Sequence, residues 1–364
     1  MRRDRLPLTY DECRARFRWA VAAAGLPHTA HPLAALGPEG QTLTIDLTWA
    51  GADRPERALL VLSGVHGVEG FVTSAMQVDL VERLDRAAMP ADMAVVVVHS
   101  VNPWGMAWGR RQDDAGVDLN RNWQRSEHDP EANEDYAVVH PLACPDTPGL
   151  PDVDTVVAEA MTLAEDWGFD RVRDAITQGQ YTHSDGLHYG GAETREANIA
   201  LEAIARERLA GVQRLFTLDL HTGHGPRGEL TLLSDQPPGS DQDRFLREVA
   251  RPVRVEATVA NPDATTGPKR GQIANGIGAF LGPDVTAYAT SAEVGTADDM
   301  EQLVATYLES WVHRHGDRSD PVHAAAAWRY RCCFTVDDPA WEAAALAGGT
   351  ALLDRAVASV VAWD

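Results

Sequence analysis

The chain has 364 residues, a formal net charge of −22 at pH 7 and a sequence pI near 4.9. Hydrophobic residues make up 44% of the chain, which is enough for a sizeable core in one large domain or two. Because nucleic acids and many membrane surfaces are anionic, so acidic a chain is a poor match for either, and we expect neither as a partner.

The four cysteines show no C-x-x-C spacing, which favours reduced thiols and a cytoplasmic location. The first residues lack the uninterrupted apolar stretch of a signal peptide. No segment approaches the ~20 apolar residues that a membrane span needs. We therefore expect a soluble protein; the sequence does not indicate an oligomeric state.

Helical and strand patterns alternate along the chain. Apolar runs at 58–62 and 93–101 are typical of buried strands, and the helical pattern between them predicts a βαβ unit. Residues 104–151, rich in Pro, Asp, Asn and Trp, are expected to form a functional loop. Further helices are predicted at 10–25, 152–177, 194–211, 242–250 and 297–313 and beyond residue 321, and further strands at 42–49, 214–221, 229–234 and 285–293. With no internal repeat, a single α/β domain over 1–364, with helical additions at about 151–211 and 321–364, is the simplest prediction.

The central motif follows the strand at 58–62. There the sequence HGVEG places His66 and Glu69 three residues apart, before a helix. An imidazole and a carboxylate at a strand end suit a zinc ion, and ligand sites in open α/β sheets form at such ends. With 13 histidines in the chain, the H-x-x-E pattern alone is weak, and a second copy, His128 to Glu131, follows no strand and is predicted to be loop.

Three further segments place polar residues where an apolar strand ends or a loop turns. His221 ends the strand at 214–221 and would supply the third ligand of a catalytic zinc, with His224 as a competitor. Glu293 emerges from an apolar strand and is a candidate general base, although an ion pair with an arginine is an equal alternative for this residue alone. The segment DLNRN offers Arg121 and Asn120 to bind a carboxylate, and Asp118 to orient a ligand histidine.

In this order the motifs resemble those of the zinc carboxypeptidase superfamily, which includes succinylglutamate desuccinylase and aspartoacylase. SGVHGVEGF, VDLNRNW, GQYTHSDGLHYGG and LDLHTGHGP resemble, more closely, a bacterial branch known only as a domain of unknown function. The resemblance covers nearly the whole chain and implies a mixed, mostly parallel central sheet flanked by helices.

The same resemblance implies a set of roles. One zinc ion per chain would be held by His66, Glu69 and His221, with Glu293 as the base and Asp118 orienting His66. Asn120 and Arg121 would hold a substrate carboxylate. An upstream arginine, Arg111 or Arg110, would polarise the scissile carbonyl; Arg111 is the residue selected. Tyr181 and Tyr189 are the candidates for a tyrosine over the site, and His183 and His188 in the same segment are either pocket residues or plain loop residues.

The predicted function is therefore a zinc-dependent hydrolase of an amide or peptide bond next to a free carboxylate, acting on a peptide or small molecule. A carboxypeptidase and an N-acyl amino acid deacylase would use the same residues, so the sequence does not separate them. A zinc-containing protein that binds carboxylates without catalysis is the alternative from another class.

Overall fold

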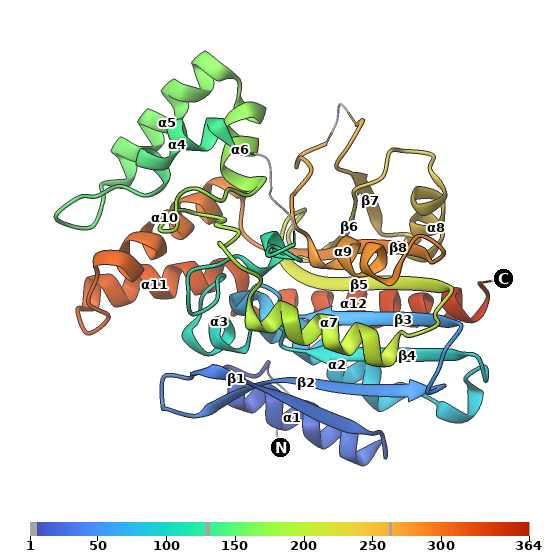
Figure 1. The fold of residues 1–364 in the computed structure, drawn as a ribbon. Coiled ribbons are helices and arrows are strands. Elements are labelled where there is room, and N and C mark those ends of the chain that lie inside the picture. Colours follow the sequence, from blue (N-terminus) through green and yellow to red (C-terminus); the bar gives the residue numbers. More distant parts are fainter. Residues whose placement is uncertain (1–5, 128–131, 262–263, 364) are drawn as a thin grey trace.

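The computed structural model describes residues 6–127, 132–261 and 264–363; the second H-x-x-E copy lies outside these residues. An eight-stranded sheet runs through the molecule in the order β1-β2-β4-β3-β5-β8-β6-β7 (Figure 1). The strands are β1 (His28–Leu36), β2 (Thr42–Gly51), β3 (Arg57–Ser63), β4 (Met93–His99), β5 (Arg214–Gly223), β6 (Leu230–Ser234), β7 (Arg254–Ala257) and β8 (Thr286–Gly295). The four central strands β4, β3, β5 and β8 are parallel, whereas β1, β2 and β6 join through antiparallel pairings. The expected mixed, mostly parallel sheet is confirmed.

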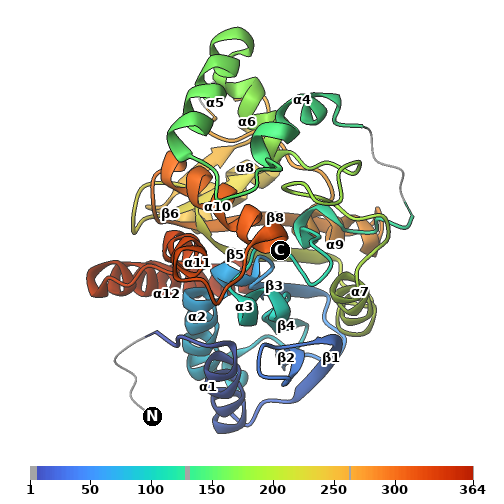
Figure 2. The same ribbon diagram turned by 90° about the vertical axis from the view of Figure 1, so that its left-hand side faces the viewer.

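Helices cover both faces of this sheet (Figures 1 and 2). One core cluster packs the sheet against α1 (Tyr10–Ala23), α2 (Gly70–Arg83), α8 (Asp241–Ala250) and α12 (Pro339–Val361). A second cluster packs the other face against α7 (Glu196–Arg208) and α9 (Ile273–Leu281). In β3, Leu59 and Val61 belong to the first cluster and Leu60 and Leu62 to the second. Because alternate side chains of a strand point to opposite faces, a strand covered on both sides needs the continuous apolar run seen here.

A third group of helices lies beyond the carboxyl ends of the parallel strands (Figure 1). It comprises α3 (Pro103–Trp108), α4 (Glu134–Ala143), α5 (Val153–Trp167), α6 (Phe169–Thr177), α10 (Asp299–His315) and α11 (Pro321–Phe334). Short 3₁₀ segments occupy Gly67–Glu69, Arg86–Ala88 and Leu119–Arg121. The expectation of loop throughout 104–151 is wrong for α3 and α4. Tyr136, Val139 and Ala143 of α4 are buried at helical spacing, so this stretch carried a helical pattern of its own.

The last helix corrects a second expectation. By length and composition α12, with 23 residues and a mean hydropathy of 1.4, is apolar enough to cross a membrane, which the sequence was not expected to offer. Its buried residues, among them Trp341, Ala345, Gly349, Leu352 and Ala356, follow one face of the helix. That face packs on α2 and the sheet, and 33% of the apolar window of the helix is buried inside the molecule. The single-domain division of the chain stays a prediction, and α7 and α12 are parts of the central core.

The connections reverse direction at β3. The chain passes from β3 through α2 to β4 on one side, as predicted for a βαβ unit, and places β5 and then β8 on the other side. The connection that follows β3 and the connection that follows β5 therefore run away from each other. In open α/β sheets such a switch point leaves a crevice where ligands bind.

Candidate active site

The segment after β3 turns sharply before it enters α2. Gly64 has a positive φ of 63°, and His66 precedes the 3₁₀ turn Gly67–Glu69, which leads directly into the helix. A Cβ atom on Gly67 would lie 2.1 Å from the main-chain carbon of Gly105, so only glycine allows this turn to pack against α3. The turn places the side chains of His66 and Glu69 on the same side.

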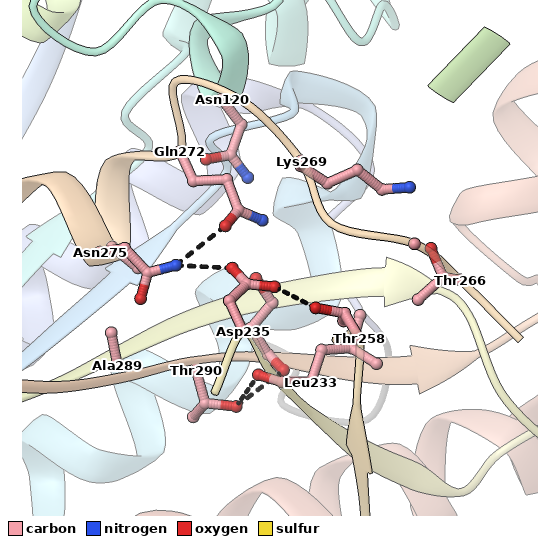
Figure 3. A pocket seen from close by; sticks show the side chains of 13 residues that line it. Asn120, Leu233, Asp235, Thr258, Thr266, Lys269, Gln272, Asn275, Ala289 and Thr290 are labelled. Atoms are coloured by element: carbon pink, nitrogen blue, oxygen red, sulfur yellow. Dashed lines mark hydrogen bonds between the residues drawn. The ribbon is translucent and has the colours of Figure 1, made fainter. Parts of the chain in front are cut away.

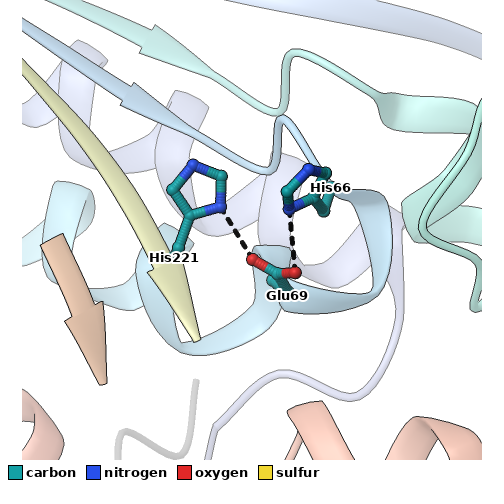
Figure 4. A group of neighbouring side chains, drawn as sticks. All are labelled: His66, Glu69 and His221. Carbon is teal, nitrogen blue, oxygen red and sulfur yellow. Dashed lines mark hydrogen bonds and ion pairs between the residues drawn. The ribbon is translucent and has the colours of Figure 1, made fainter. Parts of the chain in front are cut away.

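Glu69 lies between two histidine rings (Figure 4). Its Oε1 is 2.9 Å from Nδ1 of His66, and its Oε2 is 2.8 Å from Nδ1 of His221. All three side chains are buried, and one ligand atom from each lies within 4.8 Å of the others. Burial raises the pKa of Glu69, but the two histidines outweigh it and hold this pKa below its ordinary value. Two nitrogens and an ionised carboxylate facing one point form a donor set that fits zinc.

An aspartate stands behind each ring. Oδ1 of Asp118 lies 3.3 Å from Nε2 of His66, and Oδ2 of Asp219 lies 2.8 Å from Nε2 of His221. Neither oxygen of the fully buried Asp219 receives a hydrogen bond from another described group. A buried carboxylate without donors is costly, so the nearby imidazole is the partner that accounts for it. A carboxylate within ion-pair distance of Nε2 favours a proton on that nitrogen, which leaves the Nδ1 lone pair free for a metal.

Sequence reasoning did not assign a role to Asp219. A signal was present, because residues two apart on a strand point to the same face and Asp219 precedes His221 by two positions. For His188 the sequence left a pocket role and a loop role open; its Nδ1 lies 3.2 Å from Oδ2 of Asp118, and its φ is 52°. Burial lowers the pKa of His188 to about 3, so the ring is neutral and donates to Asp118.

Glu293 reaches the same place from β8. In the parallel pairing of β5 and β8 it stands directly beside His221. Its Oε2 accepts a hydrogen bond of 3.4 Å from the main-chain N–H of His224. Burial raises the pKa of the Glu293 carboxyl, and the nearby Glu69 carboxylate opposes the lowering effect of His221. His224 points elsewhere: its Nε2 lies 3.5 Å from Oε2 of Glu256.

The two adjacent arginines have different partners. Arg111 donates from Nε to Oδ2 of Asp118 at 2.9 Å, and its Nη1 lies 3.4 Å from Oε1 of Glu69. Arg110 is buried and pairs through Nε with Oε1 of Glu309 at 2.8 Å. Arg111 therefore lies at the metal-ligand cluster, whereas Arg110 belongs to a buried ion pair with α10.

Main-chain carbonyls hold Arg121. Its Nη1 donates to the carbonyl of Asn120 and its Nη2 to the carbonyl of Thr177, both at 2.8 Å, and its Nε also reaches Thr177. No acidic side chain among the described residues lies within ion-pair distance of it. Three of its five N–H donors are used, so a positive charge with two donors is left for an anion.

The two candidate tyrosines, Tyr181 and Tyr189, make different contacts. The hydroxyl of Tyr181 donates to the Arg121 carbonyl at 2.7 Å. Tyr189 contributes its main-chain carbonyl, which accepts from the N–H of Asp118 at 2.8 Å. The structure thus places Tyr181 where it supports Arg121, and it gives the Tyr189 side chain no described polar contact.

A polar pocket opens beside Asn120 (Figure 3). Its volume, which includes space open to solvent, is about 370 Å³, and its lining includes Asn120, Asp235, Lys269, Asn275 and Ser291. Asp235 accepts hydrogen bonds from Asn275 at 2.6 Å and from Thr258 at 2.5 Å. Nζ of Lys269 donates to Oγ1 of Thr177 at 2.8 Å. Burial, followed by the charge of Arg121, lowers the pKa of Lys269 to about 7.

Comparisons with solved structures return chains of low identity. Carboxypeptidase A from Helicoverpa armigera is 14% identical, with a TM-score of 0.46, over 89% of this chain and 74% of that one. A metallo-carboxypeptidase from Burkholderia cenocepacia is 13% identical, with a TM-score of 0.41, over 86% and 69%. A protein from Shewanella frigidimarina, provisionally named succinylglutamate desuccinylase/aspartoacylase, is 17% identical, with a TM-score of 0.40, over 80% and 72%.

No curated protein matches the chain. One family does, and its match spans residues 7–348, nearly the whole sequence. This confirms the resemblance of the motifs to a branch without an assigned function. The chain belongs to the family described as a protein of unknown function, DUF2817.

Proposed function

We propose that this protein is a zinc-dependent hydrolase of an amide or peptide bond next to a free carboxylate. The observation that carries the proposal is the position of Glu69, between the Nδ1 atoms of His66 and His221, with Glu293 beside His221. A metal site built only for structure is usually closed by four protein ligands. Three ligands with a carboxylate of raised pKa alongside are instead what a hydrolytic site needs.

His66, Glu69 and His221 would hold the zinc ion. When bound there, zinc supplies Lewis acidity and lowers the pKa of water towards ~7. Asp118 and Asp219 would keep both rings in the tautomer that presents Nδ1.

Glu293 would take the proton of the attacking water and deliver it to the leaving nitrogen. Its raised pKa suits both steps, because a base must also release the proton that it accepts. Arg111 would stabilise the negative charge that develops on the carbonyl oxygen. The charge of Arg121 would bind the substrate carboxylate, and Asn120 would add its amide donor.

The substrate class can be narrowed by the pocket beside Asn120. Its lining carries one carboxylate, Asp235, and one amine, Lys269, together with amide and hydroxyl groups. The group next to the substrate carboxylate would enter this pocket, so we expect polar side chains to be preferred. A carboxypeptidase and an N-acyl amino acid deacylase remain the two candidate activities, since both would use the same residues.

The test compares dipeptides, N-acetyl and N-succinyl amino acids, and the same dipeptides with an amidated carboxyl end. We expect hydrolysis of at least one free-carboxylate series and loss of it on amidation. Glu293→Gln should lower turnover by about 10²–10⁴-fold while zinc is retained. Glu229→Gln, on the surface, is the control for the change of charge. Unchanged turnover in Glu293→Gln would refute the mechanism, and zinc binding without any hydrolysis would favour the non-catalytic binding protein.

A further inference from the structure

Three side chains from α4 and from the loop after residue 180 form a second cluster of possible metal ligands. His140 lies on α4, and His183 and Asp185 lie on the loop that follows residue 180. We propose that His140, His183 and Asp185 bind a second divalent transition metal ion, and that this ion joins α4 to the loop. Zinc is the ion used to test the site. One ligand atom from each residue lies within 4.8 Å of the other two.

The distance between the ligand atoms of His140 and Asp185 fits a shared metal ion better than a direct hydrogen bond. Nε2 of His140 lies 3.6 Å from Oδ1 of Asp185, which is too long for a hydrogen bond. Two donors of a tetrahedral zinc ion with bonds of about 2.1 Å lie roughly 3.4 Å apart. The observed separation therefore needs a change of only a few tenths of an ångström. Nδ1 of His140 is buried and has no hydrogen-bond partner among the described residues, so no internal hydrogen bond fixes this ring.

The two rings are already arranged side by side. The centroids of His140 and His183 are 4.1 Å apart with an interplanar angle of 27°, and Tyr136 packs against both at 5.6 Å. Both histidines are only partly exposed, whereas Asp185 lies at the surface. Two imidazoles and one carboxylate are a donor set that zinc accepts, with one position left for water.

Hydrogen bonds fix the main chain of the loop that carries His183 and Asp185. Gln180, which is fully buried, accepts from the main-chain N–H groups of Thr182 and His183 through Oε1. Its Nε2 donates to the carbonyl of His183 at 2.7 Å, and the N–H of Gly186 also reaches that carbonyl. The turn that presents His183 and Asp185 is therefore preorganised, which lowers the entropic cost of binding an ion.

A metal ion here would have a structural effect. The same loop continues to His188, which contacts Asp118 at the first cluster. Fixing the loop to α4 would restrain that contact without adding a group to the reaction. The proposal does not depend on the proposed hydrolase, because it concerns a different set of residues.

The test is zinc content per chain, measured on protein without a histidine tag after loading with zinc and removal of excess. We expect two zinc ions in the wild type, one in His183→Ala and one in His221→Ala, and none in the double variant. His31→Ala, on the edge strand β1, should keep two. Competition with a chromophoric chelator should show that His183→Ala loses a site with a dissociation constant below about 10⁻⁶ M.

Asp185→Asn is the second variant, because a conservative change at an exposed position leaves the fold intact. It should weaken the second site at least tenfold, and zinc should raise its melting temperature less than that of the wild type. A wild type that holds a single zinc ion, lost in His221→Ala and kept in His183→Ala, would overturn the second site and leave the first. Two ions that persist in both His183→Ala and Asp185→Asn would also overturn it.

Discussion

Replacing Arg111 and Arg110 in turn separates two neighbouring residues of the same type. Arg111→Met removes the guanidinium that lies 3.4 Å from Glu69 and 2.9 Å from Asp118. Loss of one donor to a developing oxyanion costs about 2.7–4 kcal/mol, so kcat/KM should fall about 10²–10³-fold. Asp118 is as buried as the partner of Arg110 but keeps the N–H of Asn120 and the ring of His188, so we expect a loss of stability of about 2–3 kcal/mol.

Arg110→Met should lower the stability of the protein without lowering its activity. It leaves Glu309, which is 3% exposed, with Arg318 as its remaining partner at 3.2 Å. Breaking a buried pair typically costs 3–5 kcal/mol, and because the half-exposed Arg318 remains, we expect about 2–3 kcal/mol here. The folded fraction should retain nearly all of its activity.

Both variants are compared with the wild type by urea unfolding and by kcat/KM on a substrate found in the panel. The reasoning is wrong if Arg111→Met stays within about threefold of the wild-type kcat/KM, or if Arg110→Met loses activity to the same extent. Arg111→Lys tests whether the charge suffices. We expect only partial recovery, because an ammonium cannot reproduce the fork of a guanidinium.

Three further results are expected. Asp219→Asn should weaken zinc binding about 10–100-fold by chelator competition, whereas Asp53→Asn at the surface should not; equal affinities would remove Asp219 from the site. Gly67→Ala forces a Cβ to 2.1 Å from the main chain of α3 and should cost about 3 kcal/mol or more, against no change for Gly149→Ala, where nothing lies within 4 Å. The pKa of Lys269, lowered to about 7 in the fold against ~10.4 unfolded, means that the folded chain binds fewer protons between these values. Wild-type stability relative to Lys269→Met should therefore rise with pH from about 7 to 10, by up to about 1.4 kcal/mol per pH unit; a difference that does not change with pH in urea unfolding would contradict this.

The strongly periodic parts of the fold were predictable from the sequence. The strands at 58–62, 93–101 and 214–221 and the helix after His66 appear where the apolar patterns predict them. The edge strand β1 and the helix α9 were not predicted. β1 contains Pro32 and has no buried residue, so it lacks the apolar alternation of a half-buried strand. α9 contains Gly276, where a Cβ would lie 2.1 Å from Trp123, so packing there favours a residue that weakens the local helical signal.

The sequence predicted which residue types stand at the strand ends of the candidate site. It did not predict which residues these side chains contact. The sequence could not decide between Arg110 and Arg111, because the deciding partner of Arg110, Glu309, lies about 200 positions away on α10. Nor did the sequence show that the hydroxyl of Tyr181, a candidate for the site, donates to the carbonyl of Arg121. Contacts between residues distant in the chain depend on the tertiary fold, which local patterns do not encode.

The order of the proposed zinc ligands along the chain has a consequence for biosynthesis. His66 and Glu69 follow β3, but His221 is 152 positions beyond Glu69, at the end of β5. A nascent chain therefore has only two ligands until β5 has left the ribosome and paired with β3. Glu293 arrives later still, with β8. With the proposed roles, a growing chain would acquire the full set of zinc ligands late and the general base last, so an incomplete chain should have neither tight zinc binding nor hydrolytic activity.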